Sequence, residues 1–198
     1  MKDFEQKDEN RNLRWTEVQR RLLLEGSIFN ICEVRRKSSE NVEGDFILLD
    51  APDWVTVVPV FEGPEGEDSF LMVEQFRHGS GNVTIEFPAG TVEPGEDPLS
   101  AAARELIEET GFRAGKLFPL GSISPNPAFM NNRVHFYLAT GLGKEAEQSL
   151  DLHEQINYSI YPAEEVRRKM GGGKFDNGVM MLALEYYDRR GRIGSYQV

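Results

Sequence analysis

Three glutamates in the middle of the chain have the type and spacing of a cation site. Glu105, Glu108 and Glu109 stand at positions i, i+3 and i+4, so on a helix of about 100° per residue their carboxylates share one face. Like charges at this spacing destabilise a helix by roughly a few tenths of a kcal/mol each, so a cation is expected to relieve them. Clustered carboxylates, completed by waters and substrate phosphates, are the ligands that Mg²⁺ and Mn²⁺ use. The alternative is a solvated acidic face in which Arg104 and Glu108 form an ordinary ion pair.

These glutamates lie on the helix that the sequence indicates most clearly, residues Leu99–Thr110. Asp97 is a suitable N-cap, Pro98 suits the first helical position, and Gly111 suits the C-terminal stop. On the helical wheel, Glu109 falls beside an apolar stripe that we expect to face the core. The predicted core face consists of Leu99, Ala102, Ala103, Leu106 and Thr110.

The residues around this helix form a longer pattern. From Gly90 to Phe112 the sequence reads GTVEPGEDPLSAAARELIEETGF, which matches G-x5-E-x7-R-E-U-x-E-E-x-G-U, with U a bulky apolar residue, at every defined position. A random window of about 23 residues would match with a probability on the order of one in a billion. This pattern is the Nudix box, and the chain resembles a Nudix hydrolase over roughly Pro52–Tyr187.

The resemblance implies a role for each matching residue. Members of the family hold a divalent metal, Mg²⁺ with Mn²⁺ as a substitute, through the glutamates of the box and often through the carbonyl of the residue before its first glycine. The implied metal ligands are Glu105, Glu108, Glu109 and Ala89. Glu108 is also a candidate catalytic residue. The other box residues are expected to be structural: Glu96 and Arg104 as an ion pair between loop and helix, Gly90 for the loop turn and Gly111 for the helix stop.

The elements that must position this box predict an α/β or α+β fold, because strands come in runs interrupted by isolated helices. The predicted strands are Ser27–Val34, Gly44–Leu49, Val55–Phe61, Phe70–Gln75, Thr84–Phe87, Lys116–Ile123, Arg133–Leu138 and Ile156–Tyr161, and Pro88–Pro98 is a predicted loop. The further predicted helices are Leu13–Glu25, Ala163–Met170 and Asp176–Tyr187. The resemblance implies an α/β/α sandwich with a mixed β-sheet over residues 51–198.

Residues 1–50 then form a small N-terminal extension with a helix and strands. It resembles the extension through which these enzymes often form intertwined dimers, so the resemblance implies a homodimer. The aromatic side chains that stack on the nucleobase are expected from this extension or from the partner chain. The sequence does not choose among the candidates, which are Trp15, Phe29, Phe46 and Trp54.

Segments outside the box resemble one branch of the family. VEQFRHG at residues 73–79 and IEFPAG at residues 85–90 are similar to the Q-x-R strand and the E-x-P-A-G approach of ADP-ribose and nucleoside-diphosphate-sugar pyrophosphatases. By that resemblance Arg77 contacts the substrate phosphates, Glu86 lies beside the metal or the distal sugar, and Pro127 matches a proline past the box. The alternatives are an edge-strand charge for Arg77, an alternating polar strand position for Glu86 and a rigid loop turn for Pro127.

A polar stretch, Thr140–Gln155, is long enough to act as a lid over bound substrate. It runs into HEQINYSIYPAEEV, which resembles the E-x-I segment from which many members of this branch bring a catalytic or metal-binding glutamate. Glu154 is therefore the candidate base that activates the attacking water, with Asp151 in reserve. The alternative is a solvated loop acid.

The resemblance implies metal-dependent hydrolysis of the pyrophosphate bond of ADP-ribose or a related nucleoside diphosphate sugar, giving a nucleoside monophosphate and a sugar phosphate. Two alternatives stay open. One is a Nudix pyrophosphatase for another nucleotide, such as a dinucleotide, a coenzyme or a nucleoside triphosphate. The other is a non-catalytic sensor of nucleotide sugars, although such sensors usually lose box glutamates and every box acid is present here.

The composition agrees with a small-molecule substrate. The 198 residues are 39% hydrophobic, and Lys plus Arg number 22 against 33 Asp plus Glu, a net charge of −11. This balance argues against general nucleic-acid or anionic-membrane binding, since both need a basic field. The single cysteine, Cys32, makes no intramolecular disulfide. The chain start lacks the pattern of a signal peptide and the longest apolar runs are strand-length, so we expect a cytoplasmic protein.

Overall fold

The computed structural model describes residues 10–190 and divides the chain into two units. The first unit comprises the described part of Met1–Ala51 together with Asn126–Asn132, and the second comprises Pro52–Pro125 with the described part of Arg133–Val198. The division falls next to the predicted domain boundary. The segment Asn126–Asn132 is the exception, because it lies far along the chain from the unit to which it belongs.

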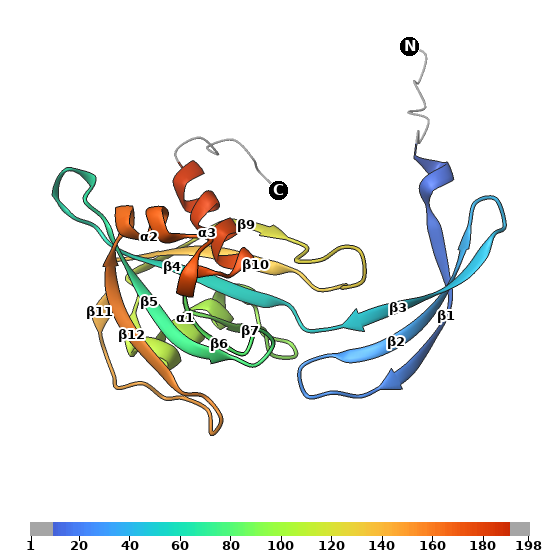
Figure 1. The fold of residues 1–198 in the computed structure, drawn as a ribbon, viewed down its shortest axis with the longest axis horizontal. Helices are drawn as coiled ribbons and strands as arrows, with labels where there is room; N and C mark the ends of the chain where they lie inside the picture. The colour runs from blue at the N-terminus through green and yellow to red at the C-terminus, as the bar shows by residue number, and fades with distance from the viewer. Residues whose placement is uncertain (1–9, 191–198) are drawn as a thin grey trace, which may run out of the picture. The chain divides into compact units, whose positions relative to one another are not determined.

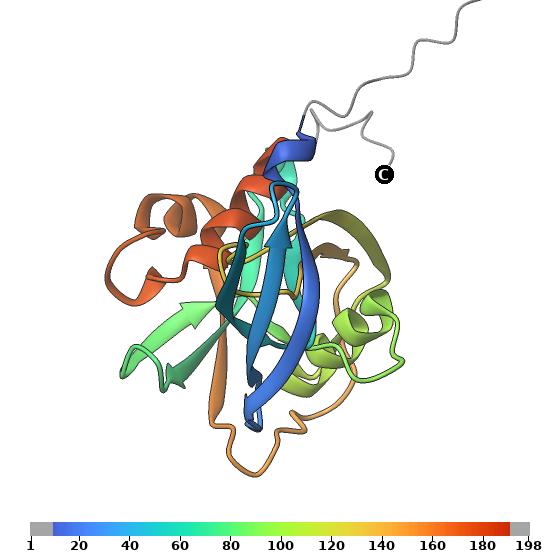
Figure 2. The same ribbon diagram turned by 90° about the vertical axis from the view of Figure 1, so that its right-hand side faces the viewer.

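The first unit is a three-stranded antiparallel sheet, seen side by side as the blue strands of Figure 2. Its elements are a 3-10 turn, η1 (Arg11–Leu13), and the strands β1 (Trp15–Leu24), β2 (Asn30–Ser38) and β3 (Glu43–Asp50). The predicted helix Leu13–Glu25 is therefore wrong. Its apolar residues are compatible with a helical stripe, but pairing with β2 along the whole of β1 overrides that local pattern.

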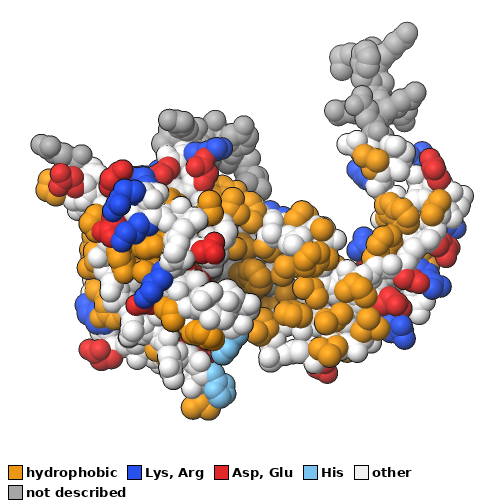
Figure 3. All heavy atoms as spheres, viewed as in Figure 1, with side chains coloured by type: hydrophobic (Ala, Val, Ile, Leu, Met, Phe, Trp, Pro, Cys, Tyr) orange, Lys and Arg blue, Asp and Glu red, His pale blue; other side chains and the backbone are white. Residues whose placement is uncertain are grey.

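One face of this sheet is apolar. Cys32 and Val34 on the central strand are buried, whereas Leu22 on β1 and Phe46 on β3, which stand opposite them, are 54% and 46% exposed. Trp15 packs edge-to-face on Phe46 with ring centroids 5.5 Å apart. Figure 3 shows the hydrophobic side chains that gather on the surface of these strands.

The second unit is built on a seven-stranded mixed sheet, in which β4 and β10 are parallel and the other pairs are antiparallel. Its main strand order is β12-β5-β4-β10-β9, with β6 paired to β5 and β7 to β4. The strands are β4 (Trp54–Phe61), β5 (Ser69–Arg77), β6 (Asn82–Glu86), β7 (Ala89–Thr91), β9 (Lys116–Ile123), β10 (Val134–Thr140) and β12 (Ile156–Pro162), and a separate two-stranded ladder is formed by β8 (Phe112–Arg113) and β11 (Gly143–Lys144). Two strands lie where loops were predicted, β7 within Pro88–Pro98 and β11 within Thr140–Gln155.

Helices cover both faces of this sheet, as the side chains of β4 show, which point alternately to one face and the other. Val55 and Val57 pack with α1 (Pro98–Thr110), whereas Val58 and Val60 belong to the cluster that contains residues of α2 (Ala163–Lys169) and α3 (Gly178–Arg189). The helices can be followed in Figure 1. The predicted sandwich with a mixed sheet is confirmed. Two 3-10 turns, η2 (Pro64–Gly66) and η3 (Gly173–Phe175), complete the unit, and no helix among residues 10–190 is long and apolar enough to cross a membrane.

Helix α1 begins at Pro98 and ends at Thr110, as the sequence predicts. Gly111 has φ +71° and closes the helix in the left-handed conformation, which favours glycine. Asp97 stands at the N-cap position, but its side chain makes no capping hydrogen bond. The predicted core face is partly wrong, because Leu99 is 41% exposed and Ala101 is buried in its place.

Candidate active site

Strand β7 holds the start of the box against α1. It pairs with β4, which places Gly90 opposite Val55 and Ala89 opposite Thr56. A Cβ at Gly90 would overlap the carboxylate of Glu105. Gly90 therefore lies in a strand and not in the predicted loop turn, and its lack of a side chain lets the box strand approach the helix.

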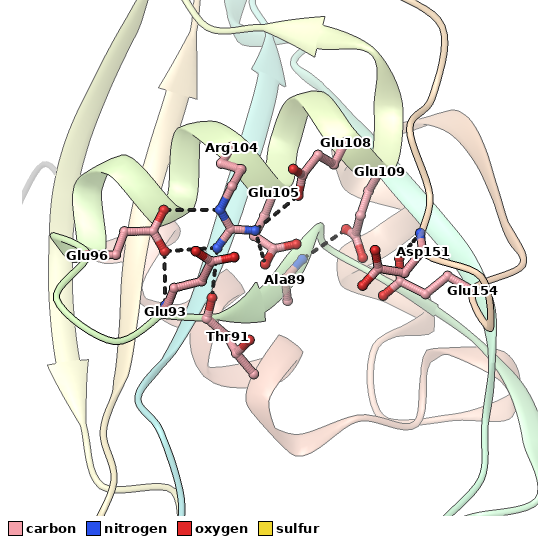
Figure 4. Close-up of polar contacts among 10 residues, drawn as sticks. All are labelled: Ala89, Thr91, Glu93, Glu96, Arg104, Glu105, Glu108, Glu109, Asp151 and Glu154. Carbon is pink, nitrogen blue, oxygen red and sulfur yellow. Dashed lines mark hydrogen bonds and ion pairs between the residues drawn. The ribbon is translucent and has the colours of Figure 1, made fainter. Parts of the chain in front are cut away.

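Arg104 is the centre of the polar network drawn in Figure 4. Its guanidinium donates to both oxygens of Glu96, at 3.0 and 2.9 Å, and to the Thr91 carbonyl at 2.9 Å. It also donates to Glu105 at 2.8 Å and to Glu108 at 3.0 Å. The predicted Glu96–Arg104 pair is thus present, and the same cation neutralises two of the three helix glutamates.

Glu109 is the helix glutamate that Arg104 does not reach. Its side chain points into the unit, and the residue is only 3% exposed. The Ala89 N–H donates to its carboxylate at 3.0 Å, the one hydrogen bond to that carboxylate within the described residues. Burial raises the pKa of Glu109 well above its ordinary value, and the charges of Glu105 and Glu154 raise it further, against the opposing effects of Ala89 and Arg77.

The carboxylates are close together without forming a closed ligand cluster. Within residues 10–190 no group of three or more acidic, histidine or cysteine side chains converges as a metal site. Arg104 forms ion pairs with Glu105 and Glu108. Burial raises the pKa of Glu105, although Arg104 opposes this effect.

The loop before β12 brings a second pair of acids to this helix. The backbone N–H groups of Asp151 and Glu154 close a small turn, one onto the Glu154 carboxylate at 3.2 Å and the other onto the Asp151 carbonyl at 2.9 Å. Figure 4 shows both carboxylates on the side of Glu109. The charge of Glu154 raises the pKa of Glu105 and of Glu109, which agrees with this placement.

A partly buried ion pair, Arg77–Glu86, stands beside these acids. Glu86 is fully buried, and Arg77 donates to its two oxygens at 3.1 and 2.6 Å. The Thr84 hydroxyl donates to Glu86 at 2.6 Å, and the Asn177 side chain helps to lower the pKa of this carboxyl. Although burial alone would raise the pKa of Glu86, these donors lower it below the ordinary value.

The predicted site residues thus fall into two groups. The box residues, Glu154, Asp151, Arg77 and Glu86 all lie in the second unit, and the charges of Glu109 and Glu154 act on Arg77. Pro127 lies in the Asn126–Asn132 segment of the first unit, where it is exposed. Trp54 is a partly buried neighbour of the second unit's core, whereas the other candidate aromatics belong to the first unit.

Sequence reasoning missed the residues that hold Glu86. Thr84 is a neighbouring position on β6, and its inward direction follows once Glu86 is known to be buried. Asn177 also caps α3, because its side chain accepts from the Val179 N–H at 2.9 Å. An asparagine before a predicted helix indicates a cap but not a partner elsewhere in the fold.

A family model described as the NUDIX domain matches residues 52–181. This match spans most of the second unit and includes every box residue, Arg77, Glu86 and the loop with Glu154.

Individual proteins resemble the chain over a similar region. The methanol dehydrogenase activator of Bacillus methanolicus is 33% identical over 121 residues, which are 61% of this chain and 65% of that protein. The ADP-ribose pyrophosphatase of Bacillus subtilis (strain 168) is 32% identical over 140 residues, or 70% of this chain and 74% of that protein. The chain thus spans just under two thirds of the activator's length. The crystal structure of an ADP compounds hydrolase matches with a TM-score of 0.77 at 22% identity, covers 91% of this chain and 96% of that one, and shows the same fold.

Proposed function

Since the chain belongs to the NUDIX domain family, we propose that it is a metal-dependent pyrophosphatase for ADP-ribose or a related nucleoside diphosphate sugar. The products would be a nucleoside monophosphate and a sugar phosphate. The observation that carries this proposal is Glu109, a buried carboxylate that no cation of the described chain neutralises by direct contact, on the helix of a complete box. The ADP-ribose pyrophosphatase of Bacillus subtilis supports the substrate class.

The donor set fits a hard divalent cation, Mg²⁺ or Mn²⁺. Its members are oxygen ligands: the carboxylates of Glu105, Glu108 and Glu109, and the carbonyl of Ala89. Glu105 and Glu108 would first have to exchange Arg104 for the cation, whereas Glu109 has no such partner to give up. When bound, the ion screens the phosphate oxygens and acidifies or orients the attacking water.

Arg77 is proposed to bind the substrate phosphates with the part of its guanidinium that Glu86 leaves open. Nε and Nη2 both point at Glu86, so the donors of Nη1 are available, and 41% of the side chain is exposed. Both Glu86 oxygens accept hydrogen bonds from Arg77. We therefore assign Glu86 a positioning role for Arg77 in place of direct contact with metal or sugar.

Glu154 is proposed to take the proton of the attacking water. A base must lie on the side of phosphorus away from the leaving phosphate. The box glutamates are assigned to the cation, and Glu154 stands on the loop that faces them (Figure 4). Asp151 in the same turn is the second candidate, and Glu108 is the third.

We further propose that the protein is a homodimer through its first unit. Leu22, Phe46 and Trp15 leave apolar side chains exposed on one face of the β1–β3 sheet, and exposed apolar patches can mark protein–protein interfaces. In analytical ultracentrifugation we expect the wild-type protein to sediment as a dimer. Leu22→Asp should sediment as a monomer, because it places a charge on this apolar face. A monomeric wild-type protein would refute the proposal.

The test of the proposed activity is a panel of ADP- and UDP-linked sugars, dinucleotides, coenzymes and nucleoside triphosphates, each with Mg²⁺. Released phosphomonoester is measured, and kcat/KM is compared across the panel. We expect a sugar nucleotide to give the highest value. A nucleoside triphosphate clearly preferred over every sugar nucleotide would support another Nudix substrate, and binding without hydrolysis of any compound would support a sensor.

A further inference from the structure

The carbonyl end of α1 is held by one short segment of the following chain, residues 144–149, which we call the strap. The last carbonyls of a helix lack partners within the helix. Here the carbonyls of four successive residues all accept hydrogen bonds from the strap. The bonds are Ser149 N to Glu108 O at 2.9 Å, Gln148 Nε2 to Glu109 O at 2.6 Å, Lys144 Nζ to Thr110 O at 3.1 Å, and Glu145 N and Ala146 N to Gly111 O at 2.9 and 3.1 Å.

Gln148 differs from the rest of the strap because it makes a second bond. The same nitrogen that donates to the Glu109 carbonyl also donates to the Ile156 carbonyl at 3.0 Å. Ile156 is the first residue of β12 and is buried. The amide group of Gln148 therefore ties the backbone of the most buried box glutamate directly to the sheet, and a side chain without two N–H donors cannot do so.

The loop with the candidate bases begins and ends at this bridge. Residues 149–155 leave Gln148 and return to Ile156, and the two bonds of the Asp151–Glu154 turn are internal to the loop. Residues 151–155 are exposed, with Leu152 at 91%. Because the tip makes no bond of its own to α1 among those found in the described residues, its place beside Glu109 depends on the base of the loop.

We propose that Gln148 is a positioning residue, which sets the distance between the Glu109 side of α1 and the acidic loop 149–155. The inference rests on the proposed function for its effect on turnover, but its effect on the loop stands by itself. Loss of the bridge removes the Gln148 donor from the Glu109 and Ile156 carbonyls, so the end of the loop at β12 is no longer tied to the helix, while the Ser149 N–H still holds the start of the loop to Glu108. Misplacement of a reacting group by about 1 Å costs up to about a hundredfold in rate, so kcat is the sensitive quantity.

The kinetic test compares two identical substitutions at the two ends of the loop. Gln148→Leu removes both donors at similar volume, whereas Gln155→Leu makes the same change at an exposed position for which no side-chain bond is found in the described chain. With ADP-ribose and saturating Mg²⁺, we expect Gln148→Leu to lower kcat by about tenfold or more while KM stays within about twofold. Gln155→Leu should match the wild type. Unchanged kcat in Gln148→Leu would overturn the proposal.

Amide hydrogen exchange of the full-length protein separates positioning from general destabilisation. In Gln148→Leu we expect faster exchange in residues 149–155, while the interior of α1 and the β4–β5 pair keep their wild-type protection. Faster exchange throughout the second unit would overturn the proposal. An exchange rate in residues 149–155 equal to that of the wild type would overturn it as well. If the wild-type protein hydrolyses no member of the panel, the proposed function fails, and the exchange result still decides whether Gln148 holds the loop.

Discussion

The surroundings of Glu86 and Glu109 have opposite effects on a buried carboxylate: they lower the pKa of Glu86 and raise the pKa of Glu109. Both residues are almost or fully inaccessible in the second unit. Glu86 receives two bonds from Arg77 and one from Thr84, and its pKa is lowered. Glu109 receives one backbone N–H, and its pKa is raised well above the ordinary value. The chain neutralises the first charge with its own residues, whereas we propose that an ion neutralises the second one.

The difference teaches that burial of an acid does not by itself identify its role. An ionised carboxylate is tolerated inside a protein when it is paired and hydrogen-bonded, and such a group orients its partner. An unpaired one costs stability unless an ion or a proton neutralises it. Counting the donors around each carboxylate therefore separates the positioning residue from the proposed metal ligand.

Substitution of Glu109 should give the largest effect on activity. Glu109→Gln keeps the shape of the side chain but removes the charge that would hold the ion. We expect hydrolysis to fall by roughly two or more orders of magnitude at saturating Mg²⁺. In EDTA the variant should unfold at the same temperature as the wild type or higher, because an uncompensated buried charge is gone. Turnover close to wild type would show that Glu109 holds no essential ion.

The loop acids should give the next largest effect. Glu154→Gln is expected to lower kcat by about ten- to a hundredfold and to change KM little, because a base acts mainly in the transition state. Steady-state kinetics on the preferred sugar nucleotide measure both constants. If Glu154→Gln keeps full kcat while Asp151→Asn abolishes it, Asp151 is the base. If neither substitution matters, Glu108 becomes the first candidate.

Substitution of Glu86 should act mainly on stability, in contrast to Glu109. Breaking a fully buried ion pair costs about 3–5 kcal/mol, but the Arg77 side chain is 41% exposed, so we expect Glu86→Gln to cost about 2 kcal/mol. For a domain of this size that is a decrease of about 4–8 °C in Tm, read from a thermal melt. A Tm equal to that of the wild type would mean that the pair is not a stabilising one.

The smallest expected effect is the pH dependence of the difference in stability between the wild type and Glu86→Gln. The pKa of Glu86 is lowered from the ordinary value of 4.5, so its contribution to stability is fully present above about pH 4.5 and is lost as pH falls through the lowered pKa. Urea melts of wild type and Glu86→Gln should therefore differ at pH 7 and converge below about pH 4.5. A difference that grows on acidification would have the wrong sign.

How far the sequence predicts this molecule depends on whether the signal is local. The box has fixed spacing, so the shared face of its glutamates follows from the helical period, and the Glu96–Arg104 pair follows from the resemblance to the family. The helix predicted at Leu13–Glu25 is wrong because strand pairing is a non-local interaction that overrides a weak apolar pattern.

The hydrogen-bond donors around the site are harder to predict from the sequence, because their contacts also join residues that are far apart in the chain. An alternating position on β6 leaves Glu86 inward or outward with equal weight until its neighbours are placed. Gln148 binds two backbone carbonyls, and such bonds require no particular residue type at the other end. Neither contact leaves a pattern in the sequence that could be recognised.

The most direct test of the central claim is the binding of Mn²⁺ to three proteins, wild type, Glu109→Gln and Glu86→Gln, followed by electron paramagnetic resonance at pH 7 without substrate. We predict that the wild type binds Mn²⁺, that Glu109→Gln binds it at least about tenfold more weakly, and that folded Glu86→Gln keeps the wild-type affinity. Equal Mn²⁺ affinity in the wild type and Glu109→Gln would contradict the claim that the buried, unpaired carboxylate of Glu109 is left for a metal ion.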